Sequence, residues 1–160
     1  MYKNKLKGNK QKMKDNYVIL DEIAYEDGSY ETIINTHLGV FSGHTEPDSI
    51  DAKYLSIYHA SEIALAKALR KFAESAINTL KREIKLLNGL IKQSVDMADD
   101  KYDIDNTSFR LLNGTLKQKQ KDLSHWEARV QGLTNTIKRR IAARDKIVAK
   151  YYQEDNKNEN

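Results

Sequence analysis

The sequence contains no cysteine and only one proline. The missing cysteines exclude a disulfide scaffold, thiolate zinc ligands and a cysteine nucleophile. One proline and seven glycines, in a chain that is 31% charged, are too few turn residues for a sandwich or barrel of many short strands. No apolar run approaches the ~18 residues of a membrane-spanning helix, and no signal-peptide core appears near the start. We therefore expect one soluble, intracellular domain without a membrane partner.

Basic charge is concentrated at the start of the chain. The formal net charge is +4, and residues 1–14 hold six lysines and no acid, so the remaining residues carry −2. Because this leader has few apolar residues, we expect it to be disordered: a solvated tail, a stretch ahead of a natural start at Met13, or an arm for nucleic acid. A globular DNA-binding domain normally carries its excess charge on the folded body. We therefore do not expect nucleic acid to be a main partner.

The first part of the chain has the pattern of a small β-sheet. Residues 17–25 and 30–35 are rich in β-branched and aromatic side chains, and the Asp-Gly pair at 27–28 between them is a strong signal for a hairpin. Residues 36–43 continue the pattern and contain two glycines, which allow a bulge or a close backbone approach. The sequence predicts a three-stranded antiparallel meander over residues 17–43. A sheet this small must cover another element or pair with a second copy.

The rest of the chain changes to a helical period. Apolar residues recur at spacings of three and four from Ile63 to Ile91, and at spacings of three, four and seven from Phe109 to Val148. These patterns predict helices over about residues 50–97 and 107–152, joined by an acidic connection and followed by a polar tail at 153–160.

Together these segments predict the α+β class: a short N-terminal meander followed by a long antiparallel helical hairpin, in a single domain over residues 15–152. Two long helices cannot hide all of their apolar surface from water. We therefore expect a homodimer or higher oligomer.

The sequence contains none of the common catalytic or cofactor motifs. No two of its four histidines have the i, i+4 spacing of a helical metal site, and no HExxH, phosphate-binding loop, dinucleotide fingerprint or nucleophile elbow is present. The acidic connection lacks the glycine and glutamate that a calcium-binding EF-hand loop requires. We therefore expect no catalytic residues, no metal and no cofactor, and thus no enzymatic activity.

Two arginines interrupt the apolar pattern of the second helix. Continuing from Leu133 and Ile137, the positions at heptad spacing are Arg140 and Arg144, with Arg139 beside them. Two arginines four residues apart lie on one helix face, where their guanidinium groups suit phosphate or diphosphate oxygens. A buried guanidinium must be paired or must face a polar cavity. The alternative to an anion site is therefore a salt bridge to a facing acid such as Glu62 or Glu74.

A second pair of candidate residues lies at the start of the same helix. Phe109 and Asn113 share one face of its first turns. An aromatic ring and an amide side by side can stack on a nucleobase and hydrogen-bond its edge. The alternative is that Phe109 is a staple that closes the helix start onto the core.

Some of these features are similar to those of a known family. THLGVFSG at residues 36–43 is followed by a Pro-Asp loop and then by SEIALAKAL at residues 61–69. In this order of motifs the chain resembles the phage anti-Thoeris sponges of the first type. The resemblance implies a small sheet with two protruding helices, assembled as dimers and trimers of dimers. It also implies binding of a cyclic ADP-ribose isomer without cleavage, and separate pockets for cyclic trinucleotides in some members.

When the family's binding residues are matched to this chain, the resemblance implies that Phe109 and Asn113 contact the base of the ligand and that Arg140 and Arg144 contact its phosphates. Asn113 departs from the family pattern because it lies closer to Phe109 than expected. The implied function is that of a phage protein that sequesters a cyclic nucleotide immune signal in the cytoplasm of the infected bacterium. The alternative is a helical interaction protein that inhibits a host defence enzyme such as a nuclease or CRISPR effector.

Overall fold

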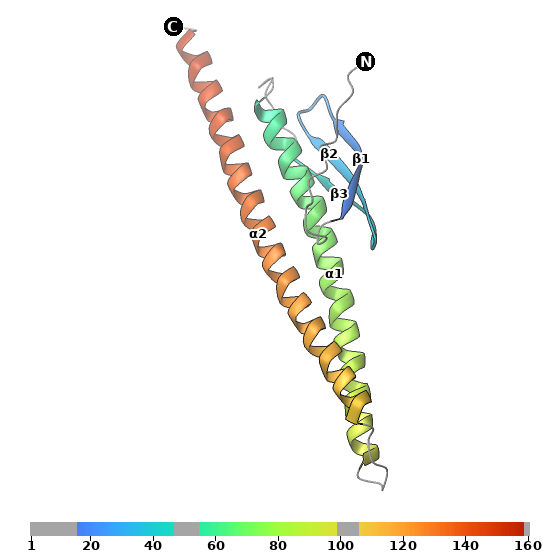
Figure 1. Ribbon diagram of the computed structural model, residues 1–160. Helices are drawn as coiled ribbons and strands as arrows, with labels where there is room; N and C mark the ends of the chain where they lie inside the picture. The colour runs from blue at the N-terminus through green and yellow to red at the C-terminus, as the bar shows by residue number, and fades with distance from the viewer. Residues whose placement is uncertain (1–15, 47–54, 99–105, 159–160) are drawn as a thin grey trace, which may run out of the picture.

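The computed structural model of the chain describes residues 16–46, 55–98 and 106–158. They form three strands and then two long helices (Figure 1), which confirms the α+β class and the order expected from the sequence. The elements are β1 (Tyr17–Ala24), β2 (Tyr30–Thr36), β3 (Gly39–His44), α1 (Leu55–Ala98) and α2 (Asn106–Asn158). Neither helix contains a stretch that is apolar over a length sufficient to cross a membrane.

The strands form an antiparallel sheet in the order β1-β2-β3. The expected hairpin at the Asp-Gly pair is confirmed, with Gly28 at a φ of 80°. Asp27 holds this turn, because its carboxylate accepts hydrogen bonds from the backbone N–H of Ser29 (2.9 Å) and from its hydroxyl (2.6 Å). These two bonds lower the pKa of Asp27.

The third strand begins later than the sequence pattern suggested. It starts at Gly39, not at Thr36, because residues between them form a tight turn. The Thr36 hydroxyl stabilises this turn by donating to the carbonyl of Gly39 (2.9 Å) and accepting from the N–H of Leu38 (3.1 Å). A threonine that bonds to the backbone two and three residues ahead favours a turn over a continued strand.

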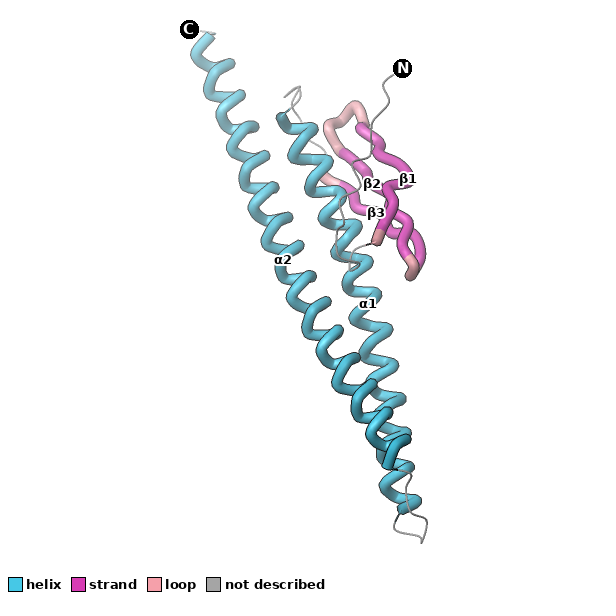
Figure 2. The backbone as a smooth tube through the Cα atoms, viewed as in Figure 1, coloured by secondary structure: helices cyan, strands magenta, loops and turns pink. Residues whose placement is uncertain are grey.

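The sheet lies against one side of α1, and α2 lies against another side, so α1 is the central layer (Figure 2). Ile34 of β2 is completely buried, and its partner across the strands, Phe41, packs against the same core. On the helix, Phe72 is 1% exposed and contacts Trp126 of α2 edge to face, with ring centroids 5.2 Å apart. These aromatic contacts connect the sheet, α1 and α2 in one core.

Small residues allow β3 to lie very close to α1. Ala60, Ala64 and Ala68 are at most 1% exposed and form one face of the helix. A Cβ atom at Gly43 would overlap the carbonyl oxygen of Ala64 and lie 2.6 Å from the amide nitrogen of Ala68. The second glycine of the THLGVFSG segment is therefore required by backbone-to-backbone packing.

Two lysines of α1 cover the free edge of β3. Lys67 Nζ donates to the carbonyl of His44 (2.9 Å), and Lys71 Nζ donates to the carbonyl of Ser42 (2.7 Å). Since β3 is an outer strand of the sheet, these carbonyls have no neighbouring strand to bind. The two lysines, one helical turn apart, protect this edge from pairing with another chain.

Helix α2 is longer than the sequence pattern indicated. It continues to Asn158, past the end expected at about residue 152, and so includes most of the predicted polar tail. Gln, Glu and Lys in this segment favour helix and no proline interrupts it. The leader at residues 1–14, the predicted helix start near residue 50 and most of the acidic connection lie outside the described residues.

Two glycines inside the helices provide a test of whether a second chain packs against the helical hairpin. Gly89 and Gly132 are exposed, and a Cβ atom at either would have no heavy atom within 4 Å. Gly89→Ala and Gly132→Ala should therefore each stabilise the chain by up to about 1 kcal/mol, because alanine favours the helix. Thermal unfolding should show an increase in Tm of about 2–4 °C. A decrease would mean that another chain packs against that glycine.

Candidate functional site

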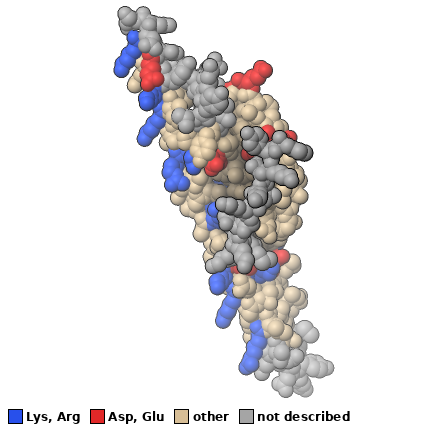
Figure 3. All heavy atoms as spheres, turned by 45° about the horizontal axis from the view of Figure 1, so that its top comes forward, with Lys and Arg blue, Asp and Glu red and all other residues tan. Residues whose placement is uncertain are grey.

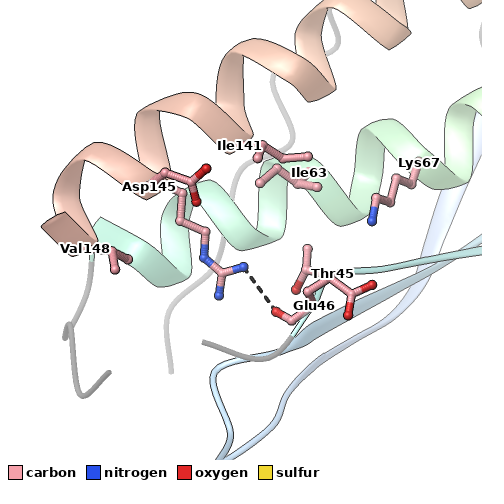
Figure 4. Close-up of a pocket in the computed structure, with 8 residues that line it drawn as sticks. Thr45, Glu46, Ile63, Lys67, Ile141, Asp145 and Val148 are labelled. Carbon is pink, nitrogen blue, oxygen red and sulfur yellow. Dashed lines mark hydrogen bonds between the residues drawn. The ribbon is translucent and has the colours of Figure 1, made fainter. Parts of the chain in front are cut away.

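A hollow of about 260 Å³ lies where the end of β3, α1 and α2 meet (Figure 4). The segment just after β3 and the two helices each contribute part of its wall. The lining residues are Thr45, Glu46, Ile63, Lys67, Ile141, Arg144, Asp145 and Val148. Their side chains combine an apolar wall with two cations and two carboxylates, so the hollow suits a ligand that has both apolar and charged groups.

Arg144 connects α2 to the sheet beside this hollow. The residue is 8% exposed. Its guanidinium donates from Nη2 to the carbonyl of Gly28 (2.8 Å) and from Nη1 to the carbonyl of Glu46 (3.2 Å), the second shown as a dashed line in Figure 4. The arginine thus meets the requirement that a buried guanidinium be hydrogen-bonded.

The two acceptors of Arg144 lie 18 positions apart in the sequence and are brought together by the sheet. Thr45 N–H donates to the carbonyl of Tyr30 (2.9 Å), and the N–H of Tyr30 donates to Thr45 Oγ1 (2.8 Å). These bonds hold the segment after β3 beside the β1–β2 turn that contains Gly28. Arg144 therefore joins α2 to two segments of the sheet at once.

Arg140, one helical turn earlier, has longer and weaker contacts. Its Nη1 lies 3.5 Å from His59 Nδ1, and its Nη2 lies 4.0 Å from Glu62 Oε2. The guanidinium carbon lies 5.4 Å from the centroid of the Tyr58 ring, within the range of a cation–π contact. The side chain of Arg140 is 28% exposed, so solvent or a ligand can reach it.

The structure brings together only part of the set of residues selected from the sequence. Arg140 and Arg144 lie one turn apart on α2, where Arg140 contacts α1 and Arg144 contacts the sheet. The salt-bridge alternative is partly realised, because Arg140 approaches Glu62, whereas Glu74 pairs with Arg70. Both arginines therefore have protein contacts, and only Arg144 lines the hollow.

The other three candidates lie elsewhere on α2. Arg139 is exposed and does not line the hollow. Phe109 and Asn113 are half-buried near the opposite end of the helix. At about 1.5 Å per residue, Phe109 lies about 46 Å from Arg140 along α2. One chain therefore cannot hold the base of a nucleotide at Phe109 and the phosphates of the same nucleotide at the arginine pair. Phe109 and the arginine pair could contact one ligand only if they came from two different copies.

Several residues at this site were not among the candidates selected from the sequence. Tyr58 and His59 contact Arg140, and Lys67 lines the hollow. Lys67 follows Ile63 by four residues, which places both on one helix face, and this spacing was the available signal. The carbonyls of Gly28 and Glu46 had no signal, since any residue type offers the same backbone acceptor.

The site contains no metal-ion cluster: in the described part of the chain, no three His, Asp or Glu residues group closely enough to bind a metal. A second, more open hollow of about 490 Å³ lies on α2 alone, next in sequence to Phe109 and Asn113, and is lined by Arg110, Leu111, Gly114, Thr115 and Gln118.

In comparisons with family models, curated proteins and solved structures, nothing matches the chain.

Proposed function

We propose that the protein binds and sequesters a small anionic nucleotide, of the cyclic ADP-ribose or cyclic oligonucleotide class, without cleaving it. The observation that supports this proposal best is the hollow beside Arg144, a cation that is almost fully buried. In the wall of this hollow Lys67 and Arg144 offer cations to the phosphate oxygens of a nucleotide, while Glu46 and Asp145 can accept from its hydroxyl and amino groups. The resemblance to phage sponges suggests the ligand class and an anti-defence role in the host cytoplasm.

The hollow is smaller than most ligand pockets, which span roughly 300–1,000 Å³. At about 260 Å³ it suits the phosphates and an adjoining sugar, while the rest of the ligand extends outward. Arg140 and Tyr58 lie one helical turn away and offer a second cation and an aromatic ring. We assign the base to Tyr58 within one chain, with Phe109 contributing only from a second copy.

Self-association is part of this proposal. Several large apolar side chains are exposed on both the sheet and the far part of the hairpin. They include Val18 (64%), Val40 (60%), Leu86 (70%) and Leu111 (67%). A second copy that covers them would bury apolar surface and enlarge the hollow into a pocket between chains.

The proposal predicts that isothermal titration with cyclic ADP-ribose isomers gives saturable heat, and that Arg140→Gln weakens binding by at least about tenfold. Hydrogen bonds to a charged group contribute about 1.5–3 kcal/mol, and each 1.4 kcal/mol is tenfold in affinity. The matched control is Arg139→Gln, which removes the same charge from the adjacent, exposed position. Because Arg140 has only long contacts, its replacement should leave the fold intact.

Three outcomes would contradict the proposal. The first is absence of heat with all cyclic ADP-ribose isomers and cyclic oligonucleotides. The second is an equal loss of affinity in the Arg139 and Arg140 variants. The third concerns capture itself: ligand released by heating should have its original mass, and a cleaved product would show that the protein is an enzyme.

The exposed leucines of the hairpin favour one alternative, a protein-interaction inhibitor of a host defence enzyme. Leu86, Leu90 and Leu111 are 50–70% exposed, and a groove in a partner could cover them. Arg140→Gln distinguishes the two functions. A sponge should lose its titration heat, whereas an inhibitor that docks through these leucines should keep its partner.

A further inference from the structure

Charge is separated between the two parts of the fold. Residues 16–46, which contain the sheet, include six acidic residues and no lysine or arginine. Helix α2 contains twelve lysines and arginines but only five acidic residues. The negative net charge outside the leader therefore conceals a strongly basic helix on one side of α1 and an acidic sheet on another.

Most of the exposed basic residues of α2 lie along one face. Eight of the twelve basic residues are exposed, and seven of these, at spacings of 7, 4, 18, 7, 4 and 7 residues, lie within about 60° of one another around the helix. This face is opposite to the one that contains buried Leu133 and Ile137, so it points away from α1. We call these residues the basic stripe: Arg110, Lys117, Lys121, Arg139, Lys146, Lys150 and Lys157. Figure 3 shows basic side chains along the edge that α2 forms.

The basic stripe is not neutralised within the described chain. None of its seven side chains forms an ion pair with another described residue. It contains two pairs of lysines at i, i+4, Lys117 with Lys121 and Lys146 with Lys150, and like charges at this spacing repel by about 0.2–0.5 kcal/mol per pair. Glu154 lies beside the stripe, not within it. Exposed helices normally mix both signs of charge, so this arrangement suits an external polyanion.

We propose that the basic stripe binds the phosphate backbone of double-stranded nucleic acid without reading its sequence. The face of α2 that holds the stripe has no Phe, Tyr or Trp between the basic residues. Single-stranded nucleic acid is normally held by bases stacked on such rings. It also lacks large apolar side chains, which a helix lying on a membrane would insert into the lipid. From Arg110 to Lys157 it extends for about 70 Å, which is about two turns of a duplex.

The test uses the full chain and measures the affinity for duplex DNA of 10 and 24 base pairs between 50 and 200 mM salt. Affinity should be higher for the longer duplex and should fall steeply with salt, by about 0.9 logarithmic units per phosphate contact. The triple variant Lys146→Gln, Lys150→Gln, Lys157→Gln should reduce this slope by roughly 2.7. The control Lys81→Gln, Lys85→Gln, Lys92→Gln removes the same charge from exposed positions of α1 and should keep the slope.

Several results would overturn the proposal. They are no duplex binding at 50 mM salt, equal slopes for the two triple variants, and tighter binding to a single strand than to the duplex. Binding to anionic phospholipid vesicles without binding to DNA would also overturn it. The basic leader is present in both triple variants, so binding through the leader alone would give equal slopes. The outcome is independent of nucleotide capture, because Arg140→Gln should not alter duplex affinity.

Discussion

Replacing Gly43 with alanine should destabilise the protein by more than about 3 kcal/mol, a large fraction of the stability of a domain of this size. The added Cβ would overlap the carbonyl oxygen of Ala64 and crowd the amide nitrogen of Ala68. These are backbone atoms of a helix, so β3 would have to move away from α1. Urea unfolding followed by circular dichroism measures this loss directly.

The control for Gly43 is Gly89→Ala, the same change at an exposed helix position where the Cβ meets nothing within 4 Å. A second variant tests the cause of the destabilisation. Ala64→Gly should not rescue Gly43→Ala, because the overlap involves the backbone carbonyl and not the Ala64 side chain. Rescue, or a loss below about 1 kcal/mol, would show that β3 does not approach α1 this closely.

Replacing Arg144 with methionine should destabilise the protein by about 3 kcal/mol. Methionine keeps much of the apolar length but removes both guanidinium hydrogen bonds, and bonds that involve a charged group contribute about 1.5–3 kcal/mol each. The carbonyls of Gly28 and Glu46 would lose this donor, and α2 would lose its link to the sheet. Thermal unfolding should show a lower Tm, and amide exchange should increase around the β1–β2 turn.

Arg139→Met is the matched control for Arg144, because it makes the same substitution at an exposed position five residues earlier. Its Tm should be nearly that of the original chain. Arg144→Lys keeps the charge but cannot reproduce two separate guanidinium bonds, so it should recover only part of the stability. Equal Tm values for the Arg139 and Arg144 variants would show that Arg144 does not hold α2 to the sheet.

Because Arg144 is buried and Arg140 is more exposed, variants of the two arginines test different roles, structural support for Arg144 and ligand binding for Arg140. Loss of titration heat in an Arg144 variant has two explanations, a missing contact or a displaced sheet. Arg140 is more exposed and has longer contacts, so its replacement tests the ligand contact with the fold intact. The nucleotide proposal therefore depends more on the Arg140 variant than on the Arg144 variant.

Much of the fold could be predicted because it depends on local periodicity. β-Branched runs on either side of an Asp-Gly pair specified the hairpin, and spacings of three and four specified two long helices. The start of β3 was missed because the Thr36 hydroxyl forms a turn through bonds to its neighbours. The end of α2 was missed because a polar helix that continues beyond the core lacks an apolar period to reveal it.

The site could be predicted only where its residues share one helix. The spacing of Arg140 and Arg144 placed them on one face, and the need to satisfy a buried guanidinium indicated polar partners. Their partners come from distant segments: Tyr58, His59 and Glu62 from α1 for Arg140, and the carbonyls of Gly28 and Glu46 for Arg144. Periodicity within one helix contains no information about which backbone carbonyls the sheet brings near it.

The sequence alone determined the elements of this protein, the position of the arginine pair within α2 and the total charge. Only the tertiary structure decided that β3 and α1 meet with no room for a side chain at Gly43. It also decided that the acidic sheet and the basic face of α2 lie on opposite sides of α1. The physical reason is that local patterns reflect interactions between neighbours in the chain, whereas backbone contact and the separation of charge depend on how distant segments pack.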